Sequence, residues 1–89
     1  MRLSEFKSRQ LAKLFELKQK LLSAYPDRTE RIEYIADLIA TKAYSLRSYS
    51  LPDYIFTLHL ASKEFKEFAE LIPSAQEIEE LFEAGEPQD

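Results

Sequence analysis

The chain has 89 residues, of which 45% are hydrophobic and 31% are charged, and its formal net charge is −4. This length suits one domain, and the balance of apolar and charged residues indicates a folded globule rather than a disordered chain. The sequence has no cysteine and a single glycine. The first fact excludes disulfides and thiolate metal sites, and the second argues against glycine-rich phosphate-binding loops.

The first predicted helix spans residues 4–25 and ends before Pro26, because the residue before a proline avoids the helical conformation. At about 100° per residue, its large apolar residues fall on one broad half of the cylinder. They are Leu3, Leu11, Leu14, Phe15, Leu17, Leu21, Leu22 and Tyr25. A stripe this wide predicts packing against two neighbours. Lys18 lies within the apolar half, and we expect its side chain to extend past the edge rather than to meet a carboxylate across an interface.

The second predicted helix spans residues 28–46, and Asp27 with Glu30 is a predicted capping pair at its start. Its apolar stripe consists of Ile32, Ile35, Ile39 and Leu46, flanked by Ala36, Ala40 and Ala43. The small alanine side chains would let a partner helix approach closely.

The third predicted helix spans residues 51–72 and ends at Pro73. Ser50 with Asp53 is a second predicted capping pair, and Pro52 suits the first turn, where no backbone donor is needed. The main stripe consists of Tyr54, Leu58, Ala61, Phe65, Phe68, Ala69 and Ile72. The serine- and tyrosine-rich stretch before this helix is thus predicted to be a helix end, a short turn and a helix start.

A short fourth helix is predicted over residues 74–84, opened by a capping box of Ser74 and Glu77. Its apolar edge consists of Ile78, Leu81 and Phe82. Short connections between helices favour antiparallel neighbours. We therefore expect an all-α fold, a compact antiparallel bundle of three long helices plus a short fourth one, forming a single domain over residues 1–85 with a disordered tail at 86–89.

Charge is segregated along the chain. Residues 1–25 carry six basic and two acidic side chains, whereas residues 74–89 carry six acidic and no basic ones. Four basic residues share one side of the first helix, opposite its apolar half, and we call them the basic strip: Arg2, Arg9, Lys13 and Lys20. Such a strip would suit an acidic partner, including nucleic acid, or it is an ordinary solvated face.

The acidic end of the chain has three interpretations: a surface for a basic partner, a counterpart of the basic strip in the same or another copy, or a solubilising tail. A helix-turn-helix over residues 36–61 is a poor alternative, because its second helix lacks the basic residues that reach phosphates and guanines.

Surplus hydrophobicity marks the start of the third helix. Ile55, Phe56 and Leu60 lie off its main stripe, so the helix is apolar nearly all round there. These residues either contact the fourth helix or the loop, or they form a partner surface together with Tyr49. Tyr44, Tyr49 and Tyr54 could be phosphorylated or could rim an interface, but we expect them to pack with their hydroxyls in water.

Catalytic constellations are not indicated. His59 is the only histidine, and no serine or cysteine partner accompanies it. Two sets of carboxylates could hold a hard cation only if they faced each other, yet both lie mainly on polar sides of their helices. The sets are Glu30, Glu33 and Asp37 on the second helix and Glu64, Glu67 and Glu70 on the third. We expect no enzyme, no cofactor and no metal.

Three non-enzymatic hypotheses follow in decreasing order. The first is a self-associating protein–protein interaction module, acting as an adaptor or regulator through Tyr49, Ile55, Phe56 and Leu60. The second is a nucleic-acid-associated regulator that uses the basic strip. The third is membrane-surface binding through the first helix, which ranks low because the bundle needs that apolar face. No signal peptide or spanning segment is recognisable, so the sequence favours a cytoplasmic protein.

Overall fold

The computed structural model describes residues 2–83, and in this part of the chain it contains helices and no strand. The predicted all-α bundle is confirmed. The α-helices are α1 (Leu3–Ala24), α2 (Thr29–Tyr44), α3 (Leu51–Glu64) and α4 (Ala75–Glu83), and the 3₁₀ helices are η1 (Pro26–Arg28), η2 (Ser48–Ser50) and η3 (Lys66–Leu71). The predicted disordered tail at 86–89 lies outside the described residues. No helix of residues 2–83 has the length and apolarity needed to cross a bilayer.

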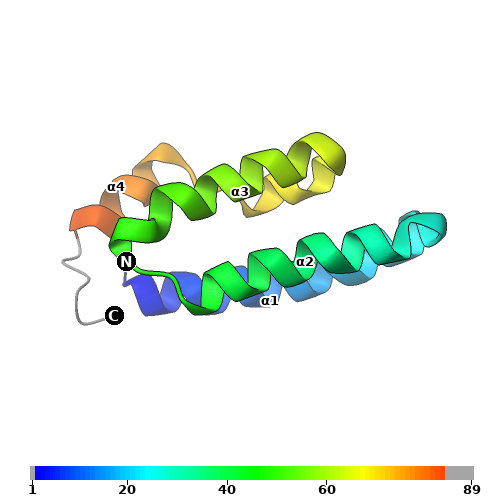
Figure 1. The fold of residues 1–89 in the computed structure, drawn as a ribbon. Coiled ribbons are helices and arrows are strands. Elements are labelled where there is room, and N and C mark those ends of the chain that lie inside the picture. Colours follow the sequence, from blue (N-terminus) through cyan, green and yellow to red (C-terminus); the bar gives the residue numbers. More distant parts are fainter. Residues whose placement is uncertain (1, 84–89) are drawn as a thin grey trace.

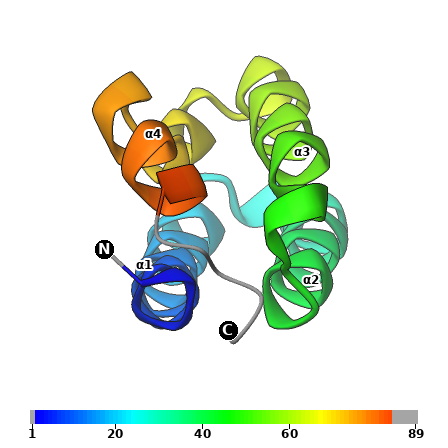
Figure 2. The same cartoon turned by 90° about the vertical axis from the view of Figure 1, so that its left-hand side faces the viewer.

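The helices occupy the four corners of an elongated body of 43 × 20 × 17 Å. Helices α1 and α2 form an antiparallel hairpin closed by η1, and α3 runs back along α2 (Figure 1). Segment η3 then reverses direction against α3 and contacts α1, and α4 continues over the first turns of α1. Figure 2 shows α3 and α4 on the same side of the α1–α2 hairpin.

The core is formed mainly by the predicted stripes, with one exchange on α1. Most large residues of these stripes are buried, among them Leu14, Ile39 and Leu58, and others pack against the core while partly buried. Phe82 of the fourth stripe was expected to face inward and is 48% exposed. Phe15, however, was expected to face inward and is 66% exposed, whereas Phe6 is buried. The reason is geometric: Phe15 sits at the margin of the apolar half, beyond the contact with α2, and Phe6 faces α3, where its ring meets Tyr54 edge to face.

The third helix is shorter than predicted. It ends at Glu64, because Phe65 adopts an extended backbone conformation with φ −131° and ψ 104°. The Phe65 ring is buried against Tyr25 and Phe68, so tertiary packing, and not a proline or glycine, reverses the chain. The change of direction moves Leu71 into the core and leaves Ala69 exposed, opposite to the prediction from a continuous helix.

The helix caps agree with the prediction at one of three positions. The backbone N–H of Glu77 donates to Ser74 Oγ over 3.1 Å, which confirms the start of α4. The predicted capping pair of Asp27 and Glu30 is wrong, because Asp27 lies in η1 and α2 begins at Thr29 without a side-chain cap. Ser50 does not cap α3 either; it bonds to the connection before that helix.

A buried polar chain crosses the core. The hydroxyl of Tyr54 donates to Gln10 Oε1 over 2.7 Å, and Gln10 Nε2 donates to the carbonyl of Leu71 over 3.0 Å. Burial raises the pKa of the Tyr54 phenol well above its usual value, which keeps the donor protonated. Tyr54 therefore differs from the expectation of a hydroxyl in water. These two hydrogen bonds fix the positions of α1, α3 and the end of η3 relative to one another.

Candidate functional site

The outward face of α3 carries two large apolar side chains. Phe56 and Leu60 are four residues apart, which places them one above the other on a helix surface, and they are 60% and 50% exposed. Ile55 lies on another side of α3, is half-buried and packs against the core. The structure thus brings two of the predicted binding residues together on one face and assigns Ile55 to the bundle.

The fourth predicted residue, Tyr49, lies in η2 just before α3 and is 84% exposed. It borders a hollow of about 320 Å³ that also touches Ser45 and Asp53. Tyr49 is therefore close to the start of α3 in the fold, although it belongs to η2 and not to the face that carries Phe56.

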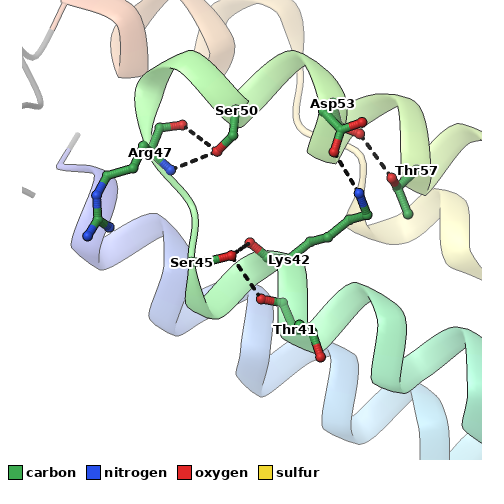
Figure 3. A network of polar contacts seen from close by, with 7 residues as sticks. All are labelled: Thr41, Lys42, Ser45, Arg47, Ser50, Asp53 and Thr57. Carbon is green, nitrogen blue, oxygen red and sulfur yellow. Dashed lines mark hydrogen bonds and ion pairs between the residues drawn. The ribbon is translucent and has the colours of Figure 1, made fainter.

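Polar contacts fix the joint that carries Tyr49 (Figure 3). Lys42 Nζ of α2 donates to Asp53 Oδ2 of α3 over 2.6 Å. The backbone N–H of Arg47 donates to Ser50 Oγ over 2.9 Å, and this hydroxyl donates to the Arg47 carbonyl over 3.1 Å. Ser45 Oγ donates to the carbonyl of Thr41 over 3.2 Å and so closes the end of α2. These contacts give Ser45 and Ser50 of the connection a structural role.

Figure 3 also shows Thr57 beside Asp53, where its hydroxyl donates to the Asp53 carbonyl one turn earlier on α3. This bond lies within the helix and leaves the Asp53 carboxylate available to Lys42.

The basic strip lies beside carboxylates of the same chain. Arg9 Nη2 is 3.2 Å from Glu77 Oε2 of α4. Lys13 and Lys20 border a small hollow together with Glu70 of η3. At Arg9, therefore, the basic strip pairs with the acidic end of the same chain, as one of the three interpretations expects. Each exposed pair of this kind contributes little, about 0–1 kcal/mol, so it orients α4 more than it holds it.

A second polar cluster joins the tip of the hairpin to the end of α3. Glu64 accepts hydrogen bonds from Arg31 at 2.7 and 3.0 Å and from Arg28 at 3.0 Å. The hydrogen bonds and charge of Arg31 lower the pKa of the Glu64 carboxyl. The hydrogen bonds and charge of Glu64 in turn raise the pKa of the Arg31 guanidinium. Tyr25 donates to Glu67 Oε2 over 3.0 Å, and that bond raises the pKa of the Tyr25 phenol.

Two of the six carboxylates weighed as a cation site are thus engaged in other ways. Glu64 and Glu67 bind the hairpin tip, and across residues 2–83 no group of three or more acidic or histidine side chains is placed to hold a metal ion. His59 lies exposed on α3.

One surface was missed by sequence reasoning. A groove of about 280 Å³ runs between α1 and α2, and its walls are built from Leu11, Leu14, Phe15 and Lys18 on α1 and from Ala36, Asp37, Ala40 and Tyr44 on α2. Two sequence signals were present: Phe15 at the margin of its stripe, and the alanines beside the stripe of α2. The helical period of the apolar residues does not show which margin of a stripe is covered by a neighbouring helix and which is left exposed.

A comparison of the chain with models of protein families, with curated proteins and with solved structures finds no match.

Proposed function

We propose that this chain is a non-enzymatic protein–protein interaction module, a cytoplasmic adaptor or regulator that binds a protein partner through α3. The observation that carries the proposal is the exposure of Phe56 and Leu60 on a helix that already buries Tyr54 and Leu58 in a complete core. Large apolar side chains on one exposed face are typical of interaction sites.

The charges around this face indicate the chemistry of the partner. Lys63 and His59 are exposed on the same helix. Its carboxylates are paired with cations of other elements: Asp53 with Lys42 of α2, and Glu64 with Arg28 of η1 and Arg31 of α2. The face is therefore apolar with a basic border. It suits an amphipathic helix whose apolar stripe is bordered by aspartate or glutamate, docked with Phe56 at the centre of the contact.

The test is site-specific cross-linking and capture. A photoreactive phenylalanine analogue at position 56 should cross-link the partner, and the same analogue at position 82 serves as the control, because Phe82 is also exposed but lies on α4. Phe56→Asp should reduce capture of that partner at least tenfold, whereas Phe82→Asp should leave it unchanged. A cross-linked protein that Phe56→Asp captures as well as the wild type does would overturn the proposal, as would the absence of any cross-link.

The nucleic-acid alternative has less support. Glu77 and Glu70 lie beside the basic strip, where phosphates would have to bind, and binding would then require their displacement. Fluorescence anisotropy with labelled DNA and RNA at low salt decides this point. If the alternative holds, Glu77→Gln should strengthen binding, because it removes a competing carboxylate.

A further inference from the structure

The groove between α1 and α2 is the second apolar surface of the molecule. It faces away from α3, η3 and α4, none of which contributes a residue to its walls. Phe15 and Tyr44 stand at its margins and are 66% and 70% exposed. Ala40 forms part of the opposite wall from Phe15, and its small side chain leaves the groove open.

The two walls are complementary to each other in size and charge. Because α1 and α2 are antiparallel and joined by η1, wall residues can be matched by their distance along the chain from the turn. This matching sets Leu11 level with Tyr44, Phe15 with Ala40, and Lys18 with Asp37, all of which line the groove. A large side chain is thus level with a small one at Phe15 and Ala40, and a cation with an anion at Lys18 and Asp37.

We propose that a second copy of the chain occupies this groove. A two-fold axis along the groove would lay α1 of each copy on α2 of the other, with all neighbouring helices antiparallel. Phe15 of each copy would fill the space over Ala40 of the other, and Lys18 would meet Asp37 of the other. Burying both aromatic margins at once supplies the apolar contact that such a dimer needs.

This inference stands apart from the proposed function, because it uses a different face. Figure 1 shows α3 on one side of the α1–α2 hairpin. The dimer would form on the other side of the hairpin, so the α3 face of each copy would stay exposed. The assembly therefore presents two copies of the partner-binding face, which would raise the avidity for a repetitive partner.

A charge exchange tests the dimer. Wild-type protein should sediment with twice the mass of the chain in a concentration-dependent manner. Lys18→Glu places two carboxylates opposite each other at both contacts, and Asp37→Lys places two ammonium groups there, so each variant should be monomeric. An equimolar mixture of the two variants restores opposite charges at both contacts and should form a heterodimer. Wild-type protein that is monomeric up to its solubility limit, or variants that dimerise as the wild type does, would overturn the proposal.

Two further measurements separate the groove from general effects on folding. Ala40→Glu should abolish dimerisation, whereas Ala12→Glu, on an exposed position of α1 outside the groove, should not, and circular dichroism reports whether both variants stay helical. The native chain has no cysteine. Lys18→Cys and Asp37→Cys should therefore form a disulfide-linked heterodimer when mixed under mild oxidation. Failure of this cross-link in two folded variants also counts against the dimer.

Discussion

The reversed segment η3 is held differently at its two ends. At its start, the Phe65 ring packs edge to face on Tyr25 at 5.4 Å, and the guanidinium of Arg28 lies 4.9 Å above the same ring. Exposed ion pairs of Glu64 border this contact. At its end, the carbonyl of Leu71 accepts a hydrogen bond from Gln10 inside the core. The first end depends on an aromatic anchor, the second on a buried polar chain.

The comparison teaches which contacts determine the path of the chain. Exposed ion pairs exchange water for a partner at little net gain, whereas a buried ring or a buried donor has no equivalent alternative. We therefore expect stability to depend most on Phe65, less on the Tyr54–Gln10 bond and least on Glu64.

The largest effect is expected at the aromatic anchor. Phe65→Ala should lower the free energy of unfolding by about 3–5 kcal/mol, because it removes a buried ring and leaves a cavity. Urea denaturation measures the loss, and Phe82→Ala on the exposed side of α4 is the control, with a change within about 0.5 kcal/mol. Equal effects of the two substitutions would show that the anchor at Phe65 does not hold η3.

An intermediate effect is expected in the buried polar chain. Tyr54→Phe leaves Gln10 Oε1 without its donor in the core, and we expect a cost of about 1–3 kcal/mol. Tyr44→Phe removes a hydroxyl from an exposed tyrosine and should change little. If thermal denaturation finds Tyr54→Phe as stable as the wild type, the hydrogen bond makes no net contribution and the two ends of η3 are not held in the way described.

The smallest effect is expected at Glu64, and it should depend on pH. The pKa of Glu64 is lower in the folded protein than in the unfolded chain, so its contribution is present above the unfolded value of about 4.3 and is lost as the pH falls below it. The difference in stability between wild type and Glu64→Gln should therefore shrink on acidification. A difference that grows at low pH would contradict this assignment.

Much of the fold could be predicted from the sequence. The period of the apolar residues identified the inward residues Ile32, Ile39 and Leu58, and the turn at Pro26 ended the first helix. The break at Phe65 could not be predicted, because Phe65 ends the helix through contacts with Tyr25 and Phe68, and the local sequence contains no proline or glycine that would break it.

The candidate surfaces were predictable to different degrees. Phe56 and Leu60 were identified because they are large apolar residues that lie outside the one stripe that the third helix buries. The groove was not identified, since Phe15 fell within an apolar half that was assumed to be fully covered. A helical period places a residue on a side of its own helix, but the neighbours decide whether that side meets protein or solvent.

The start of α1 and the end of α4 lie at the same end of the bundle (Figure 1). Because these two ends lie close together, the fold does not require the helices to be connected in their present order. A short linker across that end would allow the chain to be reopened elsewhere, for example at the connection between α2 and α3. The four helices could then be presented in a new order around an unchanged core, with a new pair of ends beside α3.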